Sequence, residues 1–239
     1  MNRNAYVGRN VEQLFKNSIS DHPDVVKKIQ DCFGIEGRFL KAISTGIHSE
    51  KADVKMEFAD GHNIDANVKA YKLSTGYNQL TRTSVKNFCK KFNLDCGSLL
   101  GMLFVNKAAR VSSMTFPTDK QDEIRKILEP ITNEMVNWAF SYKSSREILV
   151  LYERQNSVMR IYSMKEVLKN IGTDFSFTEK GNIAIGKYVI LQRKGGNGIH
   201  VKDIKKTDII HPGNNVQLKL KMNHFVAGMT AFEMASYLI

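Results

Sequence analysis

The first third of the chain carries hydrophobic positions with helical spacing. Near the N-terminus, apolar side chains recur three and four positions apart, which places them on one face of a helix: Val7, Val11, Leu14 and Phe15. A second helix is predicted to follow Asp21, with Pro23 near its start and Gly34 at its end. The stretch 37–47 is compatible with another short helix or with a loop.

From residue 53 the polarity alternates with period two, which is typical of a half-buried strand. Residues 53–58 and 64–69 both follow this pattern, and the Asp-Gly pair in 59–63 indicates a turn between them. We therefore predict a β-hairpin with a five-residue loop, in which Phe58 pairs with Ile64. This register predicts three polar pairs on one face: Glu57 with Asp65, Lys55 with Asn67, and Asp53 with Lys69.

The rest of the chain mixes the two patterns. Helices are predicted over 83–92, over 119–140 with an interruption at Pro130, and over 164–171 up to Gly172. The strand-like segments are 146–155, 158–162, 175–177, 183–192 and 216–221. The polar, glycine-bearing stretch 195–215 is predicted to be a loop with a function of its own.

Composition places the chain among ordinary globular proteins. Its 239 residues, 42% hydrophobic and 25% charged, suffice for one large domain or two small ones. No apolar run approaches the roughly 18 residues of a membrane span, and residues 1–6 lack the apolar segment of a secretory signal. The cysteines Cys32, Cys89 and Cys96 cannot all pair and show no metal-ligand spacing. We therefore expect a soluble protein of the reducing cytoplasm.

The chain is strongly basic, and the charge is concentrated. Of the formal net charge of +11, the segment 180–224 carries +7, because nine Lys and Arg residues face only Asp203 and Asp208 there. Such a stripe suits a polyanion, since each neutralised phosphate releases condensed counterions. Solubility or contact with ribosomal RNA accounts for the charge equally well.

The polar face of the hairpin has two interpretations. Its carboxylates, amide oxygen and ammonium group are suited to hold Mg²⁺ near a substrate phosphate and to orient a water molecule there. The commoner outcome for an alternating charged strand is a solvent-facing hairpin with cross-strand ion pairs. The spacing alone favours this second interpretation.

Two separated motifs change that balance. The first consists of Asp53, then Asn67-Val68-Lys69 and Gly76-Tyr77-Asn78-Gln79; the second consists of the segments 181–186 and 189–196. In the same order and at comparable distances, these segments resemble small type II restriction endonucleases of the PD-(D/E)xK superfamily. Within that superfamily the resemblance is to the four-base cutters, which include MspI and the GCGC-cutting enzymes.

The resemblance implies an α/β fold, with a central mixed β-sheet flanked by helices, and Mg²⁺-dependent hydrolysis of phosphodiester bonds in double-stranded DNA. It assigns Asp53 and Asn67 to the metal and Lys69 to the attacking water. Two positions depart from the superfamily pattern, since Ala52 replaces a proline and Asn67 an acidic residue. The lost charge at Asn67 weakens the expected metal site, and Asp65 is a candidate to compensate for it. Glu12 matches a helical glutamate that often lies near such sites.

The same resemblance assigns residues to DNA. Asn78 and Gln79 match a loop whose glutamine can wedge into the base stack, and Arg82 follows close by. Gln192, Arg193 and Lys194 match a base-reading segment, and Gly195 and Gly196 allow the backbone to approach DNA closely. The expected phosphate contacts are Lys202, Lys205, Lys206, Lys219 and Lys221, and weaker candidates for base edges are Asn214, Asn215 and Gln217. The alternatives are a polar turn that opens a helix near Thr81-Arg82, burial of Tyr77, and phosphate contact without base reading for Arg193 and Lys194.

We therefore expect a type II restriction endonuclease that cuts a short G·C-rich palindrome, with GCGC as the first candidate. A single endonuclease domain over 1–239 is expected, with a helical part and the catalytic hairpin in 1–145 and a β-rich DNA-recognition part in 146–239. Its partners would be double-stranded DNA and a cognate DNA methyltransferase, and a palindromic site would suit a homodimer of the chain. Two other functions remain open, a repair or junction nuclease of the same superfamily and a non-catalytic nucleic-acid-binding protein.

Overall fold

The computed structural model describes residues 3–45, 53–72, 76–109, 114–195, 203–205, 208, 211 and 213–239. The chain divides into two compact units, each assembled from separate stretches. Unit 1 contains 1–76, 140–170 and 222–239, and unit 2 contains 77–139 and 171–221. The sequence predicted one boundary within the chain, at residue 145, between two continuous parts. In the structure, each unit instead combines separate stretches of the chain.

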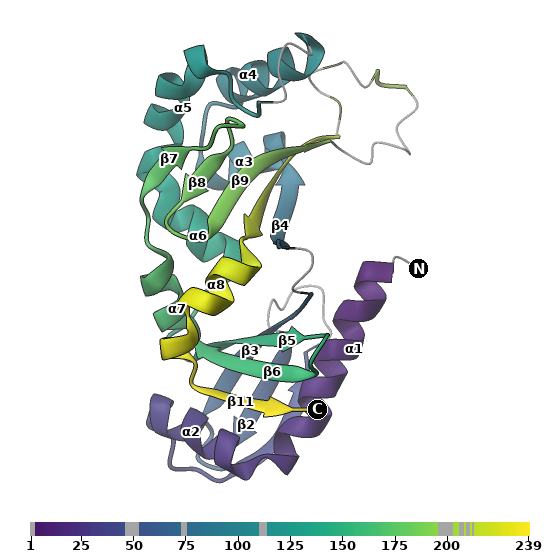
Figure 1. Cartoon of the computed structure of the whole chain (residues 1–239), viewed down its shortest axis with the longest axis vertical. Coiled ribbons are helices and arrows are strands. Elements are labelled where there is room, and N and C mark those ends of the chain that lie inside the picture. Colours follow the sequence, from purple (N-terminus) through teal and green to yellow (C-terminus); the bar gives the residue numbers. More distant parts are fainter. Residues whose placement is uncertain are drawn as a thin grey trace. The chain divides into compact units, whose positions relative to one another are not determined.

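Unit 1 is built on a six-stranded mixed sheet with the strand order β1-β2-β3-β5-β6-β11. Figure 1 labels β2, β3, β5, β6 and β11 of this sheet. Its strands are β1 (Phe39–Ser44), β2 (Val54–Phe58), β3 (Asn63–Tyr71), β5 (Glu147–Glu153), β6 (Val158–Ser163) and β11 (Ala235–Leu238). Strands β3 and β5 pair in parallel, and the other neighbours pair antiparallel. The unit also contains α8 (Met222–Gly228), the short helix η6 (Thr230–Phe232) and most of α7 (Met164–Ile171).

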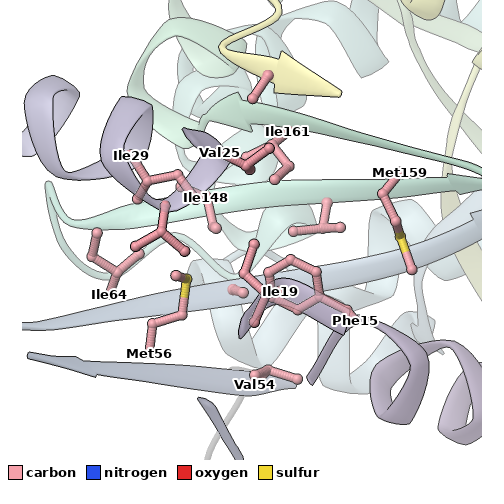
Figure 2. Close-up of a cluster of buried hydrophobic side chains, with 14 of the residues drawn as sticks. Phe15, Ile19, Val25, Ile29, Val54, Met56, Ile64, Ile148, Met159 and Ile161 are labelled. Carbon is pink, nitrogen blue, oxygen red and sulfur yellow. The ribbon is translucent and has the colours of Figure 1, made fainter. Parts of the chain in front are cut away.

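The core of unit 1 lies between this sheet and the two N-terminal helices. The helices α1 (Arg3–Ser18) and α2 (Pro23–Phe33), with the short turn η1 (Ile19–Asp21), contribute Phe15, Ile19 and Ile29, all fully buried. Figure 2 shows these side chains packed against Met56 and other residues of the central strands. Gly34 ends α2 in the left-handed conformation with φ 62°, as its position in the sequence predicts.

The predicted hairpin is present as β2 and β3, but its register differs from the prediction by two residues. Glu57 pairs with Asn63 and Lys55 with Asp65, so the expected pairs Glu57–Asp65, Lys55–Asn67 and Asp53–Lys69 are wrong. The turn is tighter than expected because the Phe58 N–H donates to the His62 carbonyl (3.0 Å). A shift of two residues preserves which side chains share a face.

Unit 2 is built on a five-stranded antiparallel sheet with the order β4-β10-β9-β8-β7. Its strands are β4 (Asn78–Ser84), β7 (Phe175–Phe177), β8 (Ile183–Ile185), β9 (Val189–Gly195) and β10 (Asn214–Leu220). Its helical segments are α3 (Val85–Phe92), α4 (Cys96–Ala109), η3 (Thr118–Lys120), α5 (Gln121–Leu128), η4 (Glu129–Ile131) and α6 (Thr132–Phe140), the last of which ends in unit 1. Phe88, Phe92 and Trp138 pack edge-on or tilted against one another in its core.

Several predicted elements need correction. Residues 39–44 form strand β1 because their backbone pairs with β2, although their polarity does not alternate cleanly. Residues 78–84 form β4, so no helix opens at Thr81-Arg82, and Ser84 instead caps α3 by accepting the Asn87 N–H. The helix predicted over 119–140 is broken by η4 at Pro130, as expected. No pattern in the sequence indicated α4, α8 or β11.

Fold-level expectations are otherwise met. The chain is a mixed α/β structure with a mixed sheet and flanking helices. Within the described residues, no helix combines the length and the apolar character that crossing a bilayer requires.

Candidate active site

Asp53 is held at the start of β2 by backbone bonds on both sides. Its N–H donates to the Ala66 carbonyl of β3 (3.0 Å), and its carbonyl accepts the Thr45 N–H (3.4 Å). Its side chain accepts the Val68 N–H at Oδ2 (2.7 Å). The sheet thus fixes both the position and the orientation of the carboxylate.

Lys69 points to the same carboxylate. Its Nζ lies 3.2 Å from Asp53 Oδ2 and also donates to the Val68 carbonyl (3.3 Å). Both side chains retain partial exposure, 32% for Lys69 and 22% for Asp53, so a substrate can reach the pair. The predicted convergence of an aspartate and a lysine is therefore present, although they do not face each other in the strand register.

Asn67 is on the same face of β3 as Lys69, because side chains two residues apart on a strand share a face. It is 6% exposed. Continuing the observed β2–β3 register by one residue sets Asp53 opposite Asn67. The corrected register thus places the carboxylate nearer the carboxamide than the predicted register did.

Glu12 of α1 shares this electrostatic environment. Burial, and then the negative charge of Asp53, raise the pKa of Glu12, while Lys69 and Arg9 lower it. Two carboxylates that lie close together repel each other, and a cation between them relieves this repulsion. Glu12 therefore remains a candidate fourth member of the site.

Asp65 is on the same face of β3 as Asn67 and Lys69, nearer the start of the strand. It is paired with Lys55 of β2 on one side and with Glu147 of β5 on the other. Glu147 is 2% exposed, its Oε1 accepts the N–H groups of Lys143 and Ser144 (both 2.7 Å), and its Oε2 has no partner among the described residues. Burial raises the pKa of Glu147, and Asp65 raises it further. Glu147 carried only one signal in the sequence, an acidic residue near the start of the strand-like segment 146–155.

The donor set suits Mg²⁺ better than a transition metal. The described part of the chain contains no group of three or more His, Cys, Asp or Glu side chains placed to hold a metal. Asp53, Asn67 and Glu12 offer oxygen atoms only, and oxygen is the ligand type that Mg²⁺ prefers. Both described hydrogen bonds to Asp53 use Oδ2, which leaves Oδ1 for another ligand.

The expected base-reading segment lies on β9, and its three side chains do not share a face. Gln192 and Lys194 face one side of the sheet, and Arg193 faces the other. The Arg193 guanidinium donates to the Leu103 carbonyl of α4 (3.0 Å), and burial lowers its pKa. Arg193 therefore cannot read bases from the same face of β9 as Gln192 and Lys194.

The expected loop residues lie on or beside β4. Asn78 and Gln79 are its first two residues, Gln79 is exposed, and Arg82 is partly exposed. Tyr77, which precedes the strand, is 50% exposed, so it is not a core residue. Lys219 of β10 places its ammonium 5.5 Å from the centre of the Tyr77 ring.

The remaining DNA candidates are placed only in part. Lys205 is exposed, Lys221 is partly exposed, and Gly195 ends β9. Ala52, Gly196, Lys202 and Lys206 lie outside the described residues. Gly181 and Gly186 of the second motif both have positive φ, and a Cβ on Gly186 would lie 2.0 Å from the Ile171 carbonyl oxygen, so these glycines serve the fold.

Comparison with known proteins agrees with this architecture. A crystal structure of the restriction endonuclease MspI in complex with its cognate DNA is similar, with a TM-score of 0.51 and 15% sequence identity. The match covers 87% of this chain and 83% of that one. The chain has a restriction-endonuclease-like fold. No family model matches it, and no curated protein matches it either.

Proposed function

We propose that this protein is a type II restriction endonuclease that uses Mg²⁺ to hydrolyse phosphodiester bonds of double-stranded DNA at a short G·C-rich palindrome. The observation that supports this most is the ion pair of Asp53 and Lys69, which joins the start of β2 to β3, two inner strands of a restriction-endonuclease-like sheet. An aspartate, an amide and a lysine in this order are the residues that the resemblance assigns to metal binding and to the attacking water.

In this proposal, Asp53 and Asn67 hold the metal ion, and Glu12 adds a second negative charge nearby. When bound, Mg²⁺ would acidify a water molecule and neutralise charge on the phosphate. Burial, and then the nearby negative charge of Asp53, raise the pKa of Glu12, which is consistent with a site that gains from a cation.

Lys69 acts on the water. Its Nζ is held by Asp53 Oδ2 and by the Val68 carbonyl, two acceptors that fix its position without burying it. An ammonium group so held can donate a hydrogen bond to an attacking water and orient it toward phosphorus. This positioning role requires no proton transfer by Lys69 itself.

Unit 2 supplies the contacts to DNA. Gln192 and Lys194 are proposed to face the bases, and Gln79 to enter the base stack. The phosphate contacts are assigned to Lys205, Lys219 and the basic residues of 195–215. GCGC remains the first candidate for the site, and a cognate methyltransferase would protect the host genome from cleavage.

The test replaces Lys69 and uses Lys55 as the matched control, since both lysines lie on one face of the same hairpin. Incubated with unmethylated plasmid and Mg²⁺, Lys69→Ala should lose on the order of 100-fold or more of the cleavage rate while still binding its site. Lys55→Ala should cut as the wild type does. Undiminished cleavage by Lys69→Ala would refute the assignment of Lys69.

The wild-type products separate the other two functions. Nicks confined to branched or mismatched DNA would favour a repair nuclease. Plasmid that is shifted in a gel but intact at every Mg²⁺ concentration would favour a binding protein without hydrolytic activity.

A further inference from the structure

The five-stranded sheet of unit 2 carries a row of polar side chains across three adjacent strands. Gln217 of β10 pairs directly with Gln192 of β9 on one side and with Arg82 of β4 on the other. Directly opposed residues of antiparallel strands share a face, so the three side chains point the same way. Asn215, Lys194 and Lys219 are on this face as well.

Gln217, at the centre of this row, is buried without a partner for its donor. Its side chain is 2% exposed, and its Nε2 has no hydrogen-bond partner among the described residues. The residues beside it in the row, Arg82 and Gln192, are partly exposed. A buried amide donor without an acceptor destabilises a fold, and native proteins contain few of them. A ligand that supplies the acceptor accounts for its presence.

The charges around the row indicate the ligand. Lys194 and Lys219 flank the neutral amides on the same face, and the pKa of Lys219 is lowered, first by burial and then by the charge of Lys194. Two cations that repel each other favour an anion between or beside them. Neutral amides at the centre and cations at the margin match a duplex, in which base edges lie between two phosphate backbones.

We infer that Gln217 is a specificity-determining residue that donates a hydrogen bond to a base acceptor in the major groove of DNA, between Arg82 and Gln192. The acceptors available there are purine N7, guanine O6 and thymine O4. A sheet face can enter the major groove in the way that β-ribbon proteins do. This inference rests on the proposed function, because it requires sequence-specific binding of duplex DNA.

The experiment uses the full chain with Lys69→Ala, which is expected to bind DNA without cutting it. This protein and its Gln217→Leu derivative each select binding sites from a pool of random duplexes, and the selected sites are sequenced. Leucine has a similar volume and removes the unpartnered donor, so the thermal stability should stay equal or rise. If the leucine variant does not fold, Gln217→Met replaces it.

The expected result is a consensus that loses its preference at one base pair, with its symmetry mate, when Gln217 is replaced. The discrimination there should fall roughly 5- to 100-fold. Lys205→Ala, an exposed phosphate candidate, serves as the control and should weaken binding to all sequences alike.

Three results would overturn the inference, and the last of them is distinguishable from the first two. An unchanged consensus, or an equal loss of affinity for every sequence, would show that Gln217 does not read a base, while the proposed function stands. If the Lys69→Ala parent selects no consensus, site-specific recognition fails, and the inference fails with it.

Discussion

Asp53 and Lys69 meet at one carboxylate oxygen, Asp53 Oδ2, which also accepts the Val68 N–H. Period-two alternation determines which side chains share a face, so the polar face of the hairpin was predicted correctly. The register was not, because one hydrogen bond from Phe58 N–H to the His62 carbonyl closes the turn earlier than a five-residue loop would. The proximity of Glu12 to Asp53 depends on the packing of α1 on the sheet, which no local pattern encodes.

At this scale, Glu12→Gln tests the metal site. The raised pKa of Glu12 means that its carboxylate forms at a higher pH than an ordinary glutamate, so Mg²⁺ affinity should rise as the pH passes through that value. Glu12→Gln should weaken Mg²⁺ binding at alkaline pH on the order of tenfold and flatten this pH dependence. Calorimetric Mg²⁺ titrations across the acid-to-alkaline range measure both. A variant with the wild-type slope would exclude Glu12 from the site.

Arg193 is a second residue-scale test, because alternation along β9 separates it from its neighbours. Its guanidinium donates to Leu103 on the face opposite Gln192 and Lys194. Arg193→Ala should therefore reduce the free energy of unfolding, by about 1–3 kcal/mol, whereas Lys194→Ala should leave it unchanged and weaken DNA binding. Urea denaturation and DNA-binding titrations measure the two effects. If Arg193→Ala keeps the wild-type free energy of unfolding but no longer discriminates between DNA sequences, Arg193 is a base-reading residue after all.

Among the secondary-structure elements, the periodic helices and the hairpin could be predicted from the sequence. Strands that form only because a neighbouring strand pairs with them could not. Both N-terminal helices have apolar stripes, and α2 also has clear end signals, Pro23 at its start and Gly34 at its end. Strands β1 and β11 lie at the two edges of the sheet and exist because a neighbouring strand accepts their backbone. The polarity of β1 does not alternate cleanly, and β11 is only four residues long, so neither stands out in the sequence.

The start of β5 yields a prediction for the pH dependence of stability. Burial raises the pKa of Glu147 in the folded state above its unfolded value. The folded state therefore keeps this proton at a pH where the unfolded state has lost it, and stability falls as the pH rises above the unfolded value toward the folded one. Glu147→Gln is neutral at every pH, so its stability relative to the wild type should increase with pH over this window.

Chemical denaturation of both proteins at acid, neutral and alkaline pH measures this difference. Glu57→Gln on β2, whose carboxylate is 29% exposed and lies 3.4 Å from the Lys41 ammonium, is the matched control. A constant difference between Glu147→Gln and the wild type across the range would mean that Glu147 is ionised in the folded state.

At the scale of the whole molecule, the fold class followed from the resemblance, but the division of the chain did not. Unit 1 takes strands from three separate stretches, because β5 and β6 come from 140–170 and β11 from 222–239. Local sequence patterns cannot reveal this interleaving, because the interleaving arises from long-range strand pairing such as that of β3 with β5. The candidate catalytic residues lie in unit 1, and those candidate base-reading residues that the structure describes lie in unit 2.

The interleaving predicts how fragments behave. A fragment of residues 1–145 ends before β5 and removes Ile148, Val150, Met159 and Ile161 from the core of unit 1. It should not fold cooperatively, because β3 loses its parallel partner and an apolar face is exposed. Far-ultraviolet circular dichroism during urea unfolding tests this. A cooperative transition in the fragment would mean that 1–145 is a domain of its own.

We propose that this chain cuts DNA at one short sequence and needs a divalent ion to do so. The most direct measurement is the sequencing of plasmid ends after incubation of the wild-type protein with Mg²⁺, beside a reaction with the metal chelated. If the chain is such an endonuclease, we expect discrete fragments whose ends all derive from one G·C-rich palindrome. Without metal, we expect the plasmid to stay intact. Ends scattered over unrelated sequences, or cleavage that persists in chelator, would contradict the proposal.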